Sequence, residues 1–279
     1  MSKIIKNLTY AEYDKIEGIS NSKLSKIAIS PAHYKLSLES PQKETDALRF
    51  GSLLHCLILD PQNFEKEFAI EPIVNKRTNA GKEFLEDFYL KNEGKTIITE
   101  EQLELASILK DKLLQHPIAS KLLSGKGENE VSLFWTDDET GVRCKCKIDR
   151  IKNDIIIDLK TARSTKPEDF KRQAYDLGYH RQAAWYLSGF EKCYQRPAKS
   201  FVFVTIEKEP PYSITIFEPT ELLKEVGIIE TSKLLATYKD CLDKGQFYGY
   251  DGAEPTIQSL EPPNWVLNKY GLNEDDIFE

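Results

Sequence analysis

Residues 155–161 read IIIDLKT, an apolar run that ends in an Asp-x-Lys pair. Because side chains in a strand alternate with a period of two, Asp158 and Lys160 share one face, roughly 6.5–7 Å apart along it. The apolar residues occupy both faces, which is typical of a central strand that is covered on both sides. A carboxylate that can bind a divalent metal ion, beside an ammonium that can hold an attacking water, meets the needs of phosphodiester hydrolysis.

The preceding residues 142–151 are predicted to form a hairpin with this strand, joined by a turn at residues 152–154. Strict alternation places its side chains on two faces, namely Val142, Cys144, Cys146 and Ile148 on one and Arg143, Lys145, Lys147 and Asp149 on the other. Since the strands of a hairpin lie about 4.8 Å apart, Asp149 and Asp158 can converge on one divalent ion.

Length and composition indicate one globular α/β domain with a substantial core. The chain has 279 residues, of which 40% are hydrophobic and 30% charged. We divide it into a helical region (1–125), a catalytic core of strands and helices (126–248) and a C-terminal tail (249–279) that is expected to lie along the domain surface. No apolar run approaches the length of a membrane span, and the first five residues lack a signal-peptide core, which predicts a cytoplasmic protein without membrane contact.

Charge and cysteine content exclude several classes. The net charge of −7 weighs against a nonspecific nucleic-acid binder, which is usually basic, but not against an enzyme with a local basic channel. Five scattered cysteines argue against a disulfide framework. Cys144 and Cys146 are better explained as small core residues than as half of a zinc site, because no second pair accompanies them.

Hydrophobic spacing and capping residues predict the other elements. Ser20 is a candidate N-cap and Pro31 a helix-opening residue. The long helix near residue 110 is expected to turn inward the side chains of Leu103, Leu105, Ile108, Leu109 and Leu113. The predicted helices cover about residues 21–29, 31–36, 48–59, 101–123, 167–178, 179–190 and 220–244, and the further strands cover 131–136, 200–207 and 212–217.

Three polar residues on these helices complete the candidate set. His55 lies about 140° from Phe50 around its helix, at the edge of the apolar stripe. Gln182 and Tyr186 share a helix face at i, i+4. Each of these residues alone is more typical of a structural role, and an Asp-x-Lys pair alone also fits an ion pair on a strand. Their occurrence together with Asp149 favours a functional site.

The order of these motifs resembles the PD-(D/E)xK nuclease superfamily, specifically its RecB-like branch and the exodeoxyribonuclease VIII (RecE-type) family of phage and prophage recombination nucleases. The matching segments are GISNS (18–22), SPAHY (30–34), FGSLLH (50–55), EVSLFW (130–135), TG (140–141), KIDR (147–150), IDLKT (157–161) and GYHRQAAWY (178–186). Their combination is specific, whereas each segment alone is not. Ile148 departs from the family, which often has proline before the aspartate of this motif.

The resemblance implies a restriction-endonuclease-like α/β core, with a mixed central sheet flanked by helices and an N-terminal helical region that contributes His55. It implies a Mg²⁺ site, with Mn²⁺ as an alternative, whose ligands are His55, Asp149, Asp158 and the main-chain carbonyl of Leu159. Glu130 matches an additional acidic position that binds a second metal or holds a metal-bound water. Lys160 is the implied catalytic lysine, and Gln182 and Tyr186 are implied to support the site and the DNA backbone.

The resemblance also implies a reaction and partners. The family digests linear double-stranded DNA from 5′ to 3′, releases mononucleotides and leaves 3′ single strands for a RecT-like annealing protein. Ring-shaped homo-oligomers that encircle DNA ends are implied as well, in the cytoplasm of a bacterial host and encoded by a phage or prophage.

Three other readings remain open at the level of sequence. The first is a RecB-like endonuclease or repair nuclease, although the CRISPR-adaptation nucleases of that branch typically carry a four-cysteine cluster that this chain lacks. The second is a catalytically inactive DNA-binding protein of the same fold, against which the intact Asp149, Asp158 and Lys160 argue. The third is an unrelated α/β protein whose Asp-x-Lys is a structural ion pair.

Overall fold

A six-stranded sheet forms the centre of the molecule in a computed structural model that describes residues 2–40 and 45–272. Its strands lie side by side in the order β1 (Lys3–Ile5), β4 (Glu128–Thr136), β5 (Arg143–Lys152), β6 (Ile155–Ala162), β7 (Ser200–Glu207) and β8 (Ile214–Phe217). Strands β6 and β7 run parallel, and the other neighbouring pairs run antiparallel. The predicted α/β fold with a mixed central sheet is confirmed.

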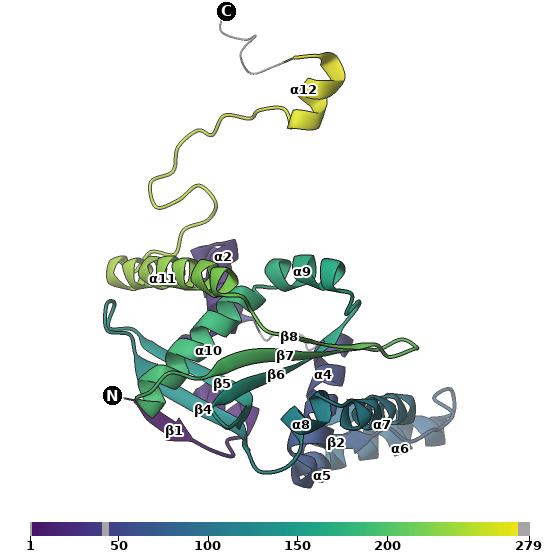
Figure 1. Ribbon diagram of the computed structural model, residues 1–279. Coiled ribbons are helices and arrows are strands. Elements are labelled where there is room, and N and C mark those ends of the chain that lie inside the picture. Colours follow the sequence, from purple (N-terminus) through teal and green to yellow (C-terminus); the bar gives the residue numbers. More distant parts are fainter. Residues whose placement is uncertain (1, 41–44, 273–279) are drawn as a thin grey trace, which may run out of the picture.

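Helices cover both faces of this sheet (Figure 1). One face carries α2 (Asn21–Ile29), α3 (Pro31–Glu39), α9 (Pro167–Asp176), α10 (Tyr179–Tyr194) and α11 (Glu221–Lys244), and the other carries α4 (Asp46–Leu59), α7 (Glu100–Gln115) and α8 (Ala119–Leu123). Strand β6 supplies both cores, since Ile156 packs on the α10 side while Ile157 and Leu159 pack on the α4 side. The prediction that this strand is buried on both faces is confirmed.

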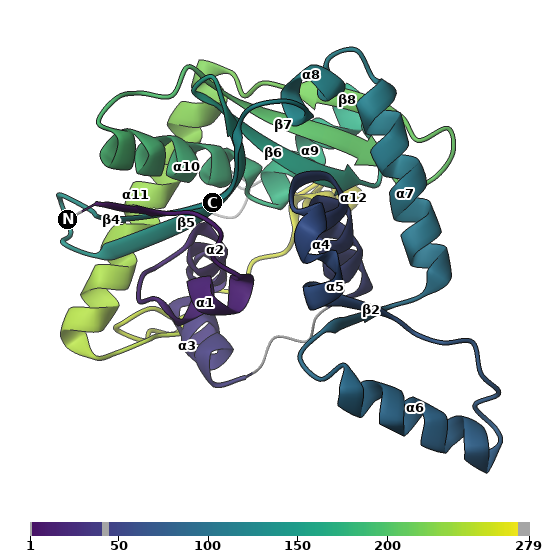
Figure 2. The same cartoon turned by 90° about the horizontal axis from the view of Figure 1, so that it is seen from below.

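Several elements are not part of the central sheet or of the helices that cover it. They are α1 (Tyr10–Lys15), the 3-10 turn η1 (Pro61–Asn63), α5 (Phe64–Glu67), β2 (Phe68–Ile70), α6 (Asn79–Lys91), β3 (Thr96–Ile98) and α12 (Asn264–Tyr270). Strands β2 and β3 form a separate parallel pair, and α6 projects away from the sheet (Figure 2). Phe68 of β2 and Ile98 of β3 nevertheless pack in the core on the α4 side. The sequence pattern predicts no helix or strand over residues 60–100. No helix in the described part of the chain has the length and apolarity needed to span a membrane.

The described part of the C-terminal tail contacts the body only at its start, where the centroid of the Tyr250 ring lies 5.4 Å from that of His33, so the prediction that it lies along the domain surface is wrong for residues 254–272. The tail runs outward and carries α12 away from the body (Figure 1), and Ile257 and Leu260 are fully exposed. Three prolines between residues 255 and 263 favour an extended backbone and remove hydrogen-bond donors. The predicted tail residues 273–279 lie outside the described residues.

Local sequence signals account for most helix boundaries. Ser20 accepts a hydrogen bond from the Lys23 N–H as predicted, and Pro31 stands in the first turn of α3. The single helix predicted over residues 101–123 is wrong, because α7 ends at Gln115 and α8 begins at Ala119, on either side of Pro117. Ile108, predicted to face inward, is 43% exposed.

Lys145 is buried, although strand alternation placed it on the charged face of β5. Its side chain is fully inaccessible, and Nζ donates to the main-chain carbonyls of Tyr13, Asp14 and Ile16 at 2.9, 3.1 and 2.7 Å. These carbonyls stand at the C-terminal end of α1, where the last carbonyl groups of a helix usually lack a donor within the helix. The Tyr13 carbonyl also accepts from the Ile16 N–H at 3.3 Å. Burial lowers the pKa of Lys145 to about 8, with the nearby charge of Lys23 adding to the shift. The ammonium therefore holds the N-terminal segment against the sheet.

Lys145→Met is expected to lower the free energy of unfolding by about 2–3 kcal/mol, because it removes hydrogen bonds from a charged donor and leaves buried carbonyls unpaired. Urea denaturation measures this loss. Lys199→Met is the matched control, since the Lys199 ammonium is exposed and lies 3.9 Å from Asp154. Equal stability of the two variants would show that Lys145 does not anchor α1.

Candidate active site

The two aspartates lie where strands β5 and β6 part. The ladder between these strands pairs Arg150 with Ile157 and goes no further toward the site, so Asp149 and Asp158 are the next residues on each strand. Strand β6 stays paired with β7 along its whole length. The backbone of β6 beyond Ile157 is therefore paired on one side and available on the other.

On this unpaired side, the main-chain groups of Leu159 interact with side chains instead of with a neighbouring strand. The Leu159 N–H donates to Asp149 Oδ2 at 2.8 Å, and the Leu159 carbonyl oxygen lies 2.8 Å from His55 Nε2. Both groups of one strand residue point to the same side, so Asp149 and His55 replace the missing β5 backbone. His55 reaches the strand from α4, and its Nδ1 is 3.6 Å from Asp149 Oδ2.

The alternation of β5 slips by one residue around Asp149. Cys144, Cys146 and Ile148 pack in the core as predicted, but Ile151, three residues after Ile148, packs in the same core. The neighbouring strand is irregular at the same level, since Glu130 has a φ of +51°, in the left-handed region that is costly for a non-glycine residue. This slip accompanies the turn of the Asp149 carboxylate toward the Leu159 N–H.

Asp158 is held by residues of β6 and α10. Its side chain is 1% exposed, and Oδ1 accepts a hydrogen bond from Gln182 Nε2 at 2.6 Å. Oδ2 is 2.6 Å from Lys160 Nζ but accepts no hydrogen bond of regular geometry. The Lys160 ammonium also lies 5.2 Å from the ring centroid of Tyr179. Tyr179 stands in the motif segment 178–186, but no role was predicted for it.

Burial and neighbouring charges fix the protonation of two groups beside Asp158. For Lys160, burial opposes the charged form, but the attraction of Asp158 and Asp149 outweighs it and the pKa is raised, so the ammonium persists at neutral pH. Burial raises the pKa of Tyr186 well above its ordinary value, with Asp158 adding to the shift. Tyr186 is therefore a neutral phenol near the carboxylates.

Glu130 is paired with a lysine rather than with the other predicted site residues. Its carboxylate contacts the ammonium of Lys147, with the two side chains 19% and 17% exposed. The structure thus groups His55, Asp149 and the Leu159 carbonyl, joins Asp158 to Lys160 and Gln182, and places Glu130 in an ion pair beside them. Lys147 was placed on the same strand face as Asp149 and in the segment KIDR, but no role was predicted for it, although its position two residues before Asp149 could have indicated its place.

The donor atoms at this site fit one divalent ion. Ligands that are adjacent on Mg²⁺ at about 2.1 Å lie about 3 Å apart. The Leu159 carbonyl oxygen lies 2.8 Å from His55 Nε2, whereas Asp149 Oδ2 lies 3.6 Å from the other ring nitrogen, Nδ1, so the imidazole must turn for one nitrogen to share an ion with both oxygens. The buried Asp158 Oδ2 lacks a regular hydrogen bond. Within residues 2–40 and 45–272, no three His, Cys, Asp or Glu side chains already form a metal-binding group. The candidate ligand set differs from such a group because it includes a main-chain oxygen, the carbonyl of Leu159.

Asp149 makes the stability of the metal-free chain depend on pH. Burial raises its pKa from 3.8 to about 6, Asp158 and Glu130 add to the rise, and His55 and Lys160 oppose it. Between these two values the folded chain binds more protons than the unfolded chain, so stability falls as pH rises through this window. In EDTA, urea denaturation at about pH 4.5 and 6.5 is expected to show a larger loss for the native sequence than for Asp149→Asn. Equal losses would contradict the shift.

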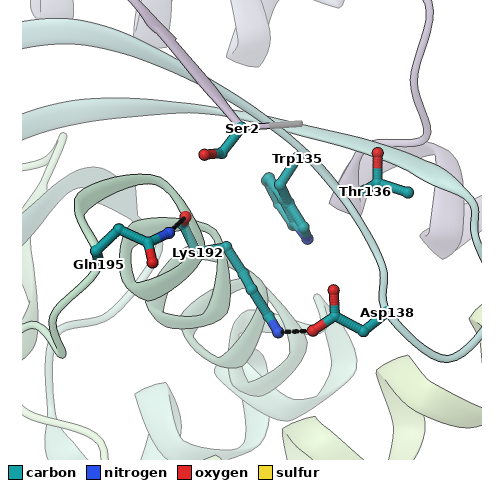
Figure 3. A pocket seen from close by; sticks show the side chains of 6 residues that line it. All are labelled: Ser2, Trp135, Thr136, Asp138, Lys192 and Gln195. Atoms are coloured by element: carbon teal, nitrogen blue, oxygen red, sulfur yellow. Dashed lines mark hydrogen bonds and ion pairs between the residues drawn. The ribbon is translucent and has the colours of Figure 1, made fainter.

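A separate hollow lies at the other end of α10. Figure 3 shows its lining residues, Ser2, Trp135, Thr136, Asp138, Lys192 and Gln195. Lys192 is ten residues beyond Gln182, about 15 Å along the helix. Lys192 is bound to Asp138 across the hollow, and none of the predicted site residues lines it. The candidate site is therefore the group at the parting of β5 and β6.

Comparisons with known proteins place the chain in a family. A solved structure from Eubacterium rectale, provisionally described as an exonuclease, has the same fold, with a TM-score of 0.61, 16% identity, and 94% of this chain and 98% of that chain covered. A structure of the protein SSO0001 matches at a TM-score of 0.30 and 19% identity over 88% and 90% of the two chains, too weakly to support an argument. No curated protein matches the sequence. Residues 20–253 match a family model, and the chain belongs to that family, the PDDEXK-like domain of unknown function (DUF3799).

Proposed function

We propose that this chain is a divalent-metal-dependent exonuclease that degrades linear double-stranded DNA. The observation that carries the proposal is the buried Asp158, held between Gln182 and Lys160 beside the Asp149 carboxylate. The PDDEXK-like family and its fold support a hydrolytic nuclease. The 5′-to-3′ direction and the release of 3′ single strands for recombination follow from the resemblance to the RecE-type family.

The proposed metal ligands are His55, Asp149, Asp158 and the Leu159 carbonyl. Bound Mg²⁺ or Mn²⁺ would polarise the phosphodiester and lower the pKa of a coordinated water. The Lys160 ammonium donates hydrogen bonds to the attacking water or to a phosphate oxygen and neutralises the charge that develops there. Gln182 fixes the Asp158 carboxylate through its amide, and the neutral Tyr186 hydroxyl can donate toward the DNA backbone.

The experiment uses a linear duplex labelled at either the 5′ or the 3′ end, incubated with the full chain in Mg²⁺, Mn²⁺ or EDTA. We expect metal-dependent release of the 5′ label as a mononucleotide before the 3′ label is lost. Early loss of the 3′ label would reverse the proposed polarity. No cleavage in either metal would refute the proposed activity.

A closed circular duplex separates the alternatives. An exonuclease leaves it intact, whereas an endonuclease of the RecB-like type opens it. Binding of the linear duplex without any cleavage would instead favour an inactive DNA-binding protein. The annealing partner, the ring-shaped oligomer and the phage origin stay predictions from the resemblance.

A further inference from the structure

The ion pair between Glu130 and Lys147 lies at the edge of the candidate site and has no part in the mechanism above. Both side chains are more than four-fifths buried, and the Lys147 ammonium contacts Glu130 Oε2 directly. An ion pair that is shielded from water in this way is screened less than a surface pair. The effect of this ion pair on the site therefore depends on how close Glu130 and Lys147 lie to the proposed metal ligands.

Glu130 stands across the strand pair from Asp149. The flanking pairs Asn129–Arg150 and Val131–Ile148 place these two residues at the same level of β4 and β5. The left-handed backbone of Glu130 shows that the fold holds this residue there in spite of a conformational cost.

Lys147 is close to a second acid as well. Burial raises the pKa of Glu67, and the charges of Asp60 and Glu130 act in the same direction, while Lys147 acts against them. The Lys147 charge thus acts on Glu67 as well as on its direct partner Glu130. Two-metal nuclease sites hold their ions about 3.5–4 Å apart and need carboxylates for both. Glu130 faces Asp149 across the strand pair and could share a second ion with it, but the Lys147 ammonium already contacts the Glu130 carboxylate.

We propose that the Lys147 ammonium is a built-in cation that takes the place of a second divalent ion, so that the site binds a single metal. The inference rests on the proposed function only in that one ion binds at His55 and Asp149. Lysine cannot serve as a metal ligand while protonated, so the Lys147 ammonium competes with a divalent ion for the Glu130 carboxylate. Glu130 then neutralises Lys147 and is not a metal ligand.

Isothermal titration calorimetry of the full chain with MnCl₂ tests the proposal without reference to cleavage. The native sequence is expected to bind one ion. Lys147→Met removes the competing charge at similar side-chain length, frees the Glu130 carboxylate, and is expected to bind a second ion. Lys147→Arg keeps the charge and is the matched control, with one ion expected. The double variant Lys147→Met/Glu130→Gln removes both charges and should return to one ion.

The outcomes separate this inference from the proposed function. If the native sequence binds no ion, or if Asp149→Asn leaves its binding unchanged, the proposed metal site fails and the inference fails with it. If the native sequence binds two ions, or if Lys147→Met still binds one, the metal site stands and the role of Lys147 is refuted. Should Lys147→Met not fold by circular dichroism, Lys147→Gln decides the case, because its amide keeps a hydrogen bond to Glu130 without the charge.

Discussion

Asp158→Asn is expected to slow phosphodiester cleavage by about 10³-fold or more, equivalent to about 4 kcal/mol of transition-state stabilisation. One carboxylate oxygen of Asp158 accepts a hydrogen bond from the Gln182 amide, and the other lies 2.6 Å from the Lys160 ammonium without a hydrogen bond of regular geometry. An asparagine can turn only its oxygen toward one of these donors, so its NH₂ group faces the other. The substitution also removes a negative charge from the proposed metal site. Single-turnover digestion of a labelled linear duplex measures the rate.

Asp154→Asn is the matched control for this variant. Asp154 lies in the turn that joins β5 and β6 and pairs with Arg196 at 2.7 Å, on the same hairpin as Asp158. We expect it to cleave at the native rate. Asp158→Asn should still bind duplex DNA in fluorescence anisotropy and keep its thermal midpoint. Native-rate cleavage by Asp158→Asn would show that Asp158 does not take part in catalysis and would refute the proposed active site.

Local rules predicted the half of the site that lies on β6 and α10. The alternation of a strand places Asp158 and Lys160 on one face, and the structure brings their charged atoms within 2.6 Å. The i, i+4 spacing of a helix places Gln182 and Tyr186 together, and Gln182 reaches Asp158. Both patterns are contained in short segments, so neither depends on how distant parts of the chain meet.

The other half depended on contacts that no local rule contains. His55 and Leu159 are 104 positions apart, and periodicity alone placed His55 only at the edge of an apolar stripe. Its place in the site came from the resemblance to a known family. The contact between Glu130 and Lys147 was missed because it requires both the register of β4 on β5 and a left-handed backbone at Glu130.

Fold predictions failed where one local signal outweighed another or where tertiary contacts overrode the pattern. Apolar spacing continued across Pro117, but the missing N–H and the ring of proline divided the helix into α7 and α8. Alternation assigned Lys145 to the charged face of β5, yet the carbonyls at the end of α1 bury its ammonium. A sequence pattern shows which face a side chain occupies but not what covers that face.

Lys160→Met is expected to reduce the cleavage rate by about 10²–10³-fold while Mn²⁺ binding persists. The reason lies in the raised pKa of Lys160. Burial opposes its charge, but Asp158 and Asp149 outweigh that effect, so the group remains an ammonium and cannot act as a general base at neutral pH. Its contribution is the positive charge and the hydrogen bonds that it donates. Because it is not a metal ligand, its removal should leave the ion bound.

Two measurements on the Lys160 variants distinguish this role from proton transfer. Lys160→Arg keeps a permanent positive charge and should recover part of the activity lost in Lys160→Met, whereas a lysine base would not be replaced by arginine. Calorimetry with MnCl₂ should give the same number of bound ions for the native sequence and for Lys160→Met. Lys199→Met, which removes an exposed ammonium outside the site, controls for the loss of one charge. Loss of metal binding in Lys160→Met would mean that the ammonium organises the carboxylates rather than acting on the substrate.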